Sequence, residues 1–219
     1  MHYERNNDVK IGIIGAGNLG TAIGHRLAAS GHDIMISFAR TPEKVEQAAQ
    51  QIGHDATAGT PEQTVAFGDV IVLATPWGVT LDTVAALADA LAHKVVWDTT
   101  NPFAPTMDEL VIGTTTSAGE QVAATAPHAT VVKAIAPFAQ ALASPSTTVE
   151  DRHPTVFVCG DDESARHTVA TLVADIGADP VDTGPLKLAR FTEPTGMLVT
   201  NLAYVKQLGP GIALALLGR

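Results

Sequence analysis

The sequence is poor in cysteine and in basic residues, and each shortage excludes a class of protein. Cys159 is the single cysteine among 219 residues, so neither an internal disulfide nor a cysteine-based metal cluster can form. Lysine and arginine total 13 against 23 acidic residues, and the resulting net charge of −10 argues against a nucleic-acid partner. A chain of this length buries roughly 70% of its unfolded surface, so it needs no disulfide or metal to fold.

The sequence also lacks a hydrophobic run long enough to cross a membrane. The best candidate, residues 197–217, contains Asn201 and Lys206 and is broken by Gly-Pro-Gly at 209–211, so its uninterrupted pieces are too short. We expect a buried helix, a break and a last short helix there, and no membrane partner. Residues 2–8 are polar and show no apolar signal region, and we expect a reducing, cytoplasmic setting.

Glycine is concentrated near the N-terminus in a pattern that predicts a nucleotide site. An apolar run over residues 11–14 is followed by Gly-x-Gly-x-x-Gly at Gly15, Gly17 and Gly20, and apolar residues at helical spacing come next. Strand, glycine turn and helix are the context that a dinucleotide-binding fingerprint requires. Gly15 permits the tight turn, Gly17 lets a pyrophosphate approach, and Gly20 allows close packing of helix on strand. The alternative is a glycine-rich turn that binds nothing.

Strands alternate with helices along the rest of the chain, which predicts an α/β Rossmann-type fold with a mostly parallel sheet, helices on both faces and a small C-terminal helical extension. We expect further strands at 33–38, 56–58, 70–74, 94–97, 129–135, 155–158 and 180–182. We expect helices at 42–52, from 60, at 79–91, 117–124, 164–176 and 187–208, with 104–116 as loop and 137–148 undecided. The expected domains are residues 1–150, which bind the dinucleotide, and 151–219, a smaller α/β and helical region packed on them.

The end of the second strand indicates which dinucleotide binds. NAD-binding proteins place an acidic residue about 20 residues beyond the fingerprint, on the ribose hydroxyls. Here the strand runs into Ala39 and Arg40 without an acid, and a guanidinium at this place can hold a 2′-phosphate. Ser37, Thr41 and Lys44 are candidate helpers. The sequence therefore favours NADP over NAD, although a solvated loop arginine remains the other interpretation of Arg40.

Topology alone predicts where the site lies. Ligands of such sheets bind beyond the carboxyl ends of the strands. Residues 39–41, 75–77 and 99–102 should therefore converge over the glycine loop at 15–20. Trp77 either contacts the cofactor or packs in the hydrophobic core. Asp98 either contacts the nicotinamide region or only forms hydrogen bonds that stabilise its own loop.

These motifs together resemble the NADP oxidoreductases that depend on coenzyme F-420, a deazaflavin. The resemblance covers nearly the whole length. It rests on the stretches KIGIIGAGNLG (10–20), ARTPE (39–43), VLATPW (72–77) and DTTNP (98–102) in the first half, and on VCGDDES (158–164), PVDTGPL (180–186) and ARFTE (189–193) in the second.

The resemblance implies residues for two adjoining sites. With the motif and strand-end residues above, the expected NADP contacts are Gly15, Ala16, Gly17, Asn18, Leu19, Gly20, Ser37, Ala39, Arg40, Thr41, Lys44, Ala74, Thr75, Pro76, Trp77, Val79, Asn101 and Pro102. A deazaflavin over the nicotinamide would contact Ala136, Pro137, Phe138, Pro194, Gly196 and Met197. Where the family pattern has small polar or histidine side chains, this chain has Ala136, Pro194 and Gly196, which leaves the acceptor open.

Hydride transfer between two stacked rings needs orientation and exclusion of water rather than an acid–base pair. The sequence accordingly shows no recognisable catalytic dyad and no metal-ligand spacing, and we name no catalytic residue. The competing hypotheses are a reductase of another small substrate, such as an imine, a keto acid or ferric iron, and a non-catalytic NADP sensor. Short length argues against the imine and keto-acid reductases, which add a larger helical domain. The apolar C-terminal segment predicts a homodimer.

Overall fold

Eight strands form one sheet in the order β3-β2-β1-β4-β5-β6-β7-β8, in a computed structural model that describes residues 9–38 and 40–218. The strands are β1 (Lys10–Ile14), β2 (Asp33–Ser37), β3 (Thr57–Ala58), β4 (Val70–Leu73), β5 (Val95–Asp98), β6 (Thr130–Ala134), β7 (Thr155–Gly160) and β8 (Asp179–Gly184). Neighbouring strands are parallel except β6 and β7, which are antiparallel. The mostly parallel α/β fold predicted from the sequence is confirmed.

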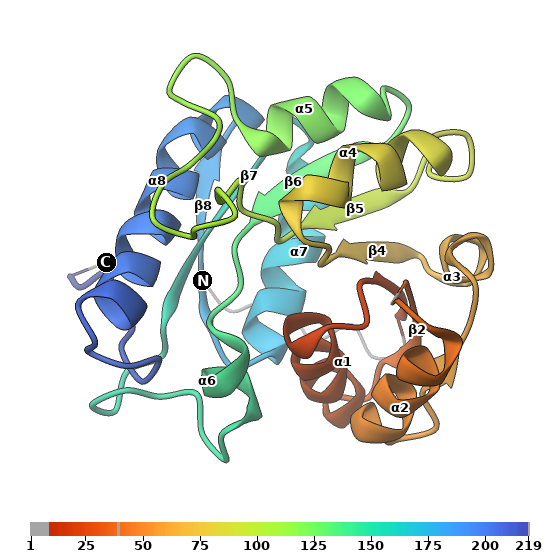
Figure 1. The fold of residues 1–219 in the computed structure, drawn as a ribbon, viewed down its shortest axis with the longest axis horizontal. Helices are drawn as coiled ribbons and strands as arrows, with labels where there is room; N and C mark the ends of the chain where they lie inside the picture. Colours follow the sequence, from red (N-terminus) through yellow and green to blue (C-terminus); the bar gives the residue numbers. More distant parts are fainter. Residues whose placement is uncertain (1–8, 39, 219) are drawn as a thin grey trace.

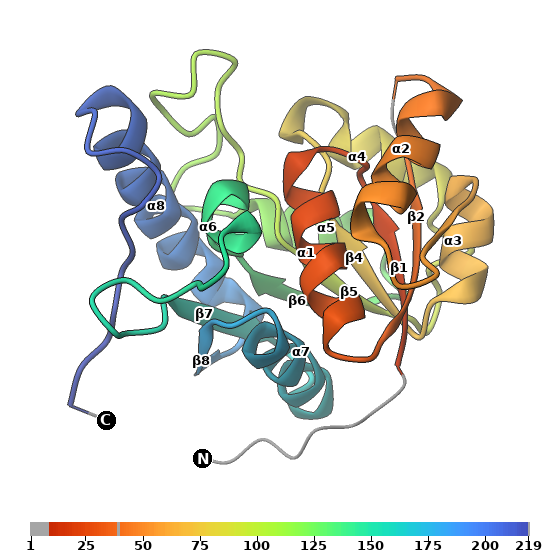
Figure 2. The ribbon, with the colours of Figure 1, turned by 90° about the horizontal axis from the view of Figure 1, so that it is seen from below.

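The helices cover both faces of this sheet (Figure 1). They are α1 (Asn18–Ala29), α2 (Pro42–Ile52), α3 (Pro61–Phe67), α4 (Trp77–Ala86), α5 (Ala118–Thr125), α6 (Ala139–Ala143), α7 (Glu163–Asp175) and α8 (Ala189–Thr200), with a 3-10 turn at Leu186–Leu188 and a π turn at Asn201–Val205. One core cluster joins the sheet to α1, α2, α6 and α7, and a second joins it to α3, α4 and α5. Helix α8 lies at the end of the molecule opposite α2 and α3 (Figure 2).

The register of the strands places their ends in one row. Ser37 pairs with Ile14, Ile14 with Leu73, Leu73 with Asp98, and Asp98 with Lys133. The chain leaves β1 toward β2 on one side and returns to β4 on the other, so a crevice opens at the carboxyl ends of β1 and β4. The segments that follow these strands are therefore neighbours in space although they lie far apart in the sequence.

Two helix starts follow the local rules that their sequences predict. Thr60 caps α3 with its hydroxyl, which accepts from the backbone N–H of Gln63 while the Gln63 side chain accepts from the Thr60 N–H. Ser117 caps α5 by accepting from the N–H of Glu120. Both caps satisfy backbone donors that a helix start leaves free, which explains why the two helices begin where they do.

The C-terminal segment was predicted incorrectly in two respects. The expected buried helix exposes Leu198 and Leu208, with relative exposures of 59% and 61%. No final helix forms over the described residues after Gly211. Instead, the backbone N–H of Thr155 donates to the carbonyl of Leu214, and the N–H of Leu216 donates to the Thr155 hydroxyl, so the tail is held along the start of β7. These bonds replace the internal bonds of a helix.

The remaining differences are shifts of boundaries. Helix α4 covers Trp77–Ala86 rather than 79–91, and the undecided segment 137–148 contains α6. Residues 104–116 form no helix or strand, as expected.

Strands β6 and β7 pair across the expected domain boundary at 150, and the division into 1–150 and 151–219 stays a proposal. No described helix is long and apolar enough to cross a membrane.

Candidate active site

The three glycines of the fingerprint have different surroundings. Gly15 has a φ of 134°, in the region that favours glycine, and a Cβ there would collide with the carbonyl of Ala74. A Cβ on Gly20 would collide with the carbonyl of Gly15, so the helix could not sit as close to the strand. A Cβ on Gly17 would meet no described atom within 4 Å. The fold itself therefore requires Gly15 and Gly20, whereas Gly17 leaves space beside the backbone.

The start of α1 is open to an anion. Gly17 is the N-cap residue, and no side chain of the described chain caps the helix. The N–H groups of Gly15 and Ala16 are already used, because they donate to the carbonyls of Ser37 and Phe38. The N–H groups of the first helical turn have no intrahelical partners, and the helix dipole adds roughly half a positive charge there. This arrangement fits the pyrophosphate of a dinucleotide.

The end of β2 presents basic side chains near that loop. Arg40, Thr41 and Lys44 are exposed around the start of α2, while Ser37 is fully buried and its hydroxyl lies 3.5 Å from the carbonyl oxygen of Ile13. Phe38, just before them, has a φ of 67°, which is rare for a bulky residue and typical of functional loops. Ala39, predicted as a cofactor contact, lies outside the described residues.

A cavity of about 1220 Å³ opens at the carboxyl ends of the central strands. Its lining includes residues from both predicted sites, namely Asn18, Leu19, Ala74, Thr75, Pro76, Trp77, Asn101, Ala136, Pro137, Phe138 and Gly196. Other predicted residues lie outside the lining, namely Gly15, Ala16, Gly17, Gly20, Ser37, Arg40, Thr41, Lys44, Val79, Pro102, Pro194 and Met197. The volume exceeds the usual range for one small ligand and has room for two stacked rings.

Segments from distant parts of the chain form the walls of the cavity. Thr75 and Trp77 follow β4, and the Thr75 hydroxyl is tied to that of Thr80 at 2.9 Å. The loop after β6 is held in place because the N–H of Ala136 donates to the Thr99 hydroxyl at 3.0 Å. Beyond it, the rings of Phe138 and Tyr204 meet edge to face, with centroids 5.4 Å apart. Aromatic and aliphatic walls of this kind suit a flat ring.

Asn101 contributes an amide side chain to this lining. Its side chain is buried, with a relative exposure of 8%, and Nδ2 donates to the backbone carbonyl of Glu193 at 3.2 Å. Its Oδ1 has no hydrogen-bond partner. A Cβ on Gly196 would come within 2.9 Å of Nδ2, so the absence of a side chain at 196 makes room for the Asn101 amide.

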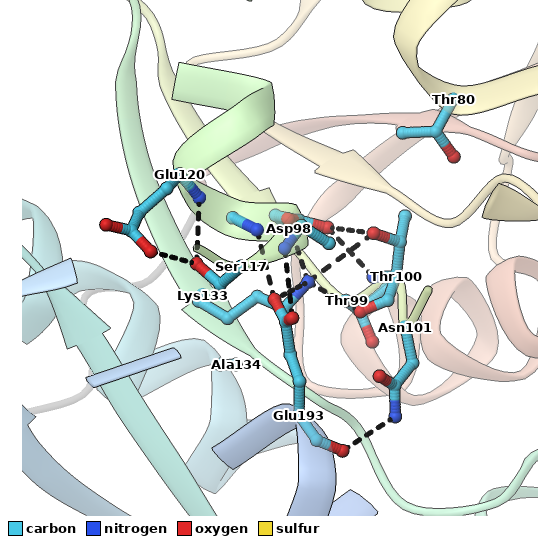
Figure 3. Close-up of polar contacts among 12 residues, drawn as sticks. Thr80, Asp98, Thr99, Thr100, Asn101, Ser117, Glu120, Lys133, Ala134 and Glu193 are labelled. Carbon is cyan, nitrogen blue, oxygen red and sulfur yellow. Dashed lines mark hydrogen bonds and ion pairs between the residues drawn. The ribbon is translucent and has the colours of Figure 1, made fainter. Parts of the chain in front are cut away.

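Behind the cavity lies a buried cluster of charges (Figure 3). The ammonium of Lys133 on β6 donates to Asp98 Oδ2 at 2.9 Å and to the carbonyl of Thr100 at 2.6 Å, and it lies 3.2 Å from Glu193 Oε1. Asp98 Oδ1 accepts from both the N–H and the hydroxyl of Thr100. Lys133 and Asp98 have no exposed surface, and Glu193 is 2% exposed. The cluster connects β5, β6 and α8.

The same carboxylate of Glu193 binds the start of α5. Its two oxygens accept from the N–H groups of Ala118 and Gly119, at 2.9 and 3.0 Å, where the helix dipole is positive. Burial by itself would lower the pKa of Lys133, but the charges of Asp98 and Glu193 outweigh it and raise that pKa above its ordinary value. Lys133 therefore stays charged at neutral pH and holds the Asp98–Asn101 loop against α8.

The cluster contains residues that the sequence interpretation did not assign to the site. Lys133 is the one charged residue of β6, and a lone lysine in a buried strand is a signal that a carboxylate partner exists. Nothing local marks Glu193 as that partner. Asp98 is tied to Thr100 and Lys133, which supports its interpretation as a residue that fixes its own loop.

The thiol of Cys159 does not line the cavity. Cys159 is buried and outside the lining, and burial raises the pKa of its thiol to about 12, so the thiol stays protonated. Within the described ranges there is no group of three or more histidine, cysteine, aspartate or glutamate side chains that could hold a metal ion.

Comparison with known proteins agrees with this geometry. Residues 10–102 match the sequence model of a family described as NADP oxidoreductase coenzyme F420-dependent. The chain is 29% identical to the F420-dependent NADP reductase of Methanocaldococcus jannaschii over 93% of this chain and 97% of that protein. It is 32% identical to rat metalloreductase STEAP3 over 84% of this chain. The matched region makes up only 36% of the length of that relative.

A solved structure extends the similarity to three dimensions. The crystal structure of a candidate F420-dependent NADP reductase from Arthrobacter sp. FB24 superposes with a TM-score of 0.82 at 27% identity, covering 94% of this chain and 99% of that one. The similarities confirm the family resemblance and the Rossmann-type fold that the sequence predicted.

Proposed function

We propose, from its place among the NADP-dependent oxidoreductases, that this chain transfers hydride between NADPH and a flat-ring acceptor, either the deazaflavin coenzyme F-420 or a flavin. The observation that carries the proposal is that the same cavity is lined by Thr75 and Trp77 and by Ala136, Phe138 and Gly196. NADPH supplies the hydride when it is bound. The chain supplies binding groups for the phosphates, a surface for each ring and shelter from water.

The residues have separate roles in this proposal. The start of α1 and the space beside Gly17 take the pyrophosphate, and Arg40, with Thr41 and Lys44, takes the 2′-phosphate. Thr75 and Trp77 orient the nicotinamide end. A hydride would carry its own electron pair, so no side chain would have to donate or accept a proton at the reacting carbon. The proton that a reduced ring takes up on nitrogen would come from solvent.

Reduction of ferric iron is a second candidate, because a relative at 32% identity is a metalloreductase. In that case a flavin that has received the two electrons of one hydride would pass them, one at a time, to two ferric ions and would return to its oxidised form.

We further propose a cytoplasmic protein that forms homodimers through the exposed apolar residues of α8 and the C-terminal tail, including Leu198, Leu208 and Leu217.

An acceptor assay tests the proposed reaction. Purified protein is mixed with NADPH and separately with F-420, FMN, FAD or a ferric chelate, and NADPH oxidation is followed by absorbance. Turnover with F-420 or a flavin is the expected result, and turnover with the ferric chelate only when a flavin is present supports the second candidate. Tight NADPH binding without turnover of any acceptor contradicts the proposal and favours an NADP sensor.

Replacing Arg40 tests the choice of NADP. We expect Arg40→Ala to weaken NADPH binding by about 10- to 100-fold and to leave NADH binding nearly unchanged, because a hydrogen bond to a charged group contributes about 1.5–3 kcal/mol. Lys187→Ala, which removes an exposed cation outside the cavity lining, is the control. Equal affinities for NADPH and NADH in the unmodified protein, unchanged in the variant, would show that Arg40 is only a solvated residue.

A further inference from the structure

The cavity extends beyond the two sites that the sequence predicted. Its volume of about 1220 Å³ is above the range of roughly 300–1,000 Å³ that is usual for a pocket holding one drug-sized ligand. Part of the lining comes from Thr147, Val149, the start of β7 at 154–157 and the C-terminal tail at 212–214, and none of these belongs to either predicted site. Strand β7 lies three places from β4 in the sheet, which is about 14 Å at the usual strand spacing. We call this part of the lining the far end.

The course of β6 explains why the cavity continues there. Strand β6 pairs with β7 only where Val132–Ala134 faces Val158–Gly160, so the earlier residues of β7 run past the end of β6. The chain leaves β6 for the loop that contains Ala136, and the C-terminal tail lies along the start of β7 instead. The N–H of Thr155 donates to the carbonyl of Leu214 at 2.7 Å, and Figure 2 shows the tail passing this end of the strand. The loop and the tail therefore line one cavity, and hydrogen bonds hold both.

The polar side chains of the far end already have partners within the protein. The hydroxyl of Thr147 donates to the carbonyl of Gly177, and the hydroxyl of Thr155 accepts from the N–H of Leu216. The other side chains that line the far end are aliphatic or aromatic. A ligand group placed there meets mainly hydrocarbon, so burial of apolar surface is the main binding energy that the far end offers.

The described residues that line the cavity include no lysine, arginine, histidine, aspartate or glutamate. The buried charges behind the lining, on Lys133, Asp98 and Glu193, are bonded to one another. The whole chain has a net charge of −10, which disfavours the approach of an anion. A phosphate or carboxylate group that entered the cavity would lose its hydration without gaining a cation in return, and this loss is costly.

We infer that the acceptor is an uncharged ring with an apolar substituent, and that this substituent occupies the far end while the ring lies beside Phe138 and Gly196. This inference rests on the proposed function and narrows its acceptor class. Among rings that can take up a hydride, it favours those with a hydrocarbon substituent over those with a phosphate or carboxylate group. The far end is then a specificity site, because it contacts the substituent and not the reacting ring.

Three flavins with the same ring system are the probes, and they carry a methyl, a hexyl or a carboxypentyl group on the ring nitrogen N10. The last two substituents have the same length and differ in their terminal charge. Dissociation constants are measured by quenching of flavin fluorescence in the presence of NADP⁺. We expect the hexyl flavin to bind at least about tenfold more tightly than the methyl flavin, because its extra CH2 groups are buried. The carboxypentyl flavin should bind at least about tenfold more weakly than the hexyl flavin, because its charge has no partner.

Leu214→Lys places a cation at the far end, because Leu214 lines the cavity and is 39% exposed. We expect it to lower the preference for the hexyl over the carboxypentyl flavin by about tenfold or more, since a charged partner now awaits the carboxylate. Leu216→Lys is the matched control, because Leu216 belongs to the same tail, is 44% exposed and does not line the cavity. Both positions are exposed enough for a lysine, and an unchanged NADPH affinity shows that each variant is folded.

The outcomes separate this inference from the proposed function. Equal affinities for the methyl and hexyl flavins, or for the hexyl and carboxypentyl flavins, overturn the assignment of the far end while NADPH oxidation can still be observed. A preference that Leu214→Lys leaves unchanged, or that Leu216→Lys changes equally, overturns it as well, and so does failure of all three flavins to bind. Failure of NADPH oxidation with every acceptor, with these affinity differences intact, contradicts the proposed function alone.

Discussion

Gly17→Ala is expected to weaken NADPH binding by about 10- to 100-fold without lowering the free energy of unfolding. The N–H groups beside Gly17 are the ones that would contact the pyrophosphate, and hydrogen bonds to a charged group contribute about 1.5–3 kcal/mol. A methyl group at 17 occupies the space through which the phosphate approaches. The backbone there has φ −92° and ψ −177°, which alanine adopts without strain.

Gly20→Ala is the matched comparison, because it adds the same methyl group in the same loop. Its Cβ collides with the carbonyl of Gly15, so we expect a clear loss of stability as well as of binding. Urea unfolding and NADPH titration, measured on both variants, separate the two effects. If Gly17→Ala bound NADPH as tightly as the unmodified protein, the glycine loop would be a structural turn rather than a phosphate site.

The sequence was sufficient to predict the features that depend only on residues close together in the chain. The three glycines, the Thr60 and Ser117 caps and the uninterrupted apolar run of β4 each depend on a few neighbouring residues, and the structure has the predicted helix or strand at each. The cavity could also be located, because the order of parallel strands determines which loops meet.

Features that depend on distant partners were not predictable in the same way. Lys133 and Asp98 are 35 positions apart, and Asn101 and Glu193 are 92 positions apart, so no periodicity connects them. The C-terminal tail was misjudged because its apolar residues suggested helix packing, whereas its backbone bonds to Thr155 decide its path. The hydrogen bond from Asn101 to the Glu193 carbonyl joins the loop after β5 to α8, and no local pattern in the sequence indicates it.

The largest effect on stability is expected from Lys133→Met. Methionine keeps most of the volume, so the change removes a charge rather than creating a cavity. It leaves the carboxylates of Asp98 and Glu193 buried without their cation, and breaking a buried ion pair in this way costs about 3–5 kcal/mol. Asp182→Asn, in the partly exposed pair with Arg166, is the control and should cost less than about 1 kcal/mol.

A triple variant distinguishes charge from packing as the cause. Lys133→Met combined with Asp98→Asn and Glu193→Gln leaves no uncompensated charge, so most of the lost stability should return if charge is responsible. A triple variant as unstable as Lys133→Met alone would contradict that explanation.

The dependence on pH gives an independent measurement of the same cluster. The pKa of Lys133 is raised in the folded state, so its stabilising contribution is fully present below the ordinary value of 10.5 and is lost as pH rises through the folded pKa. The unmodified protein should therefore lose stability above that pH more steeply than Lys133→Met does. Since Lys133 also donates to the Thr100 carbonyl, loss of its charge would free the loop after β5, which lines the cavity.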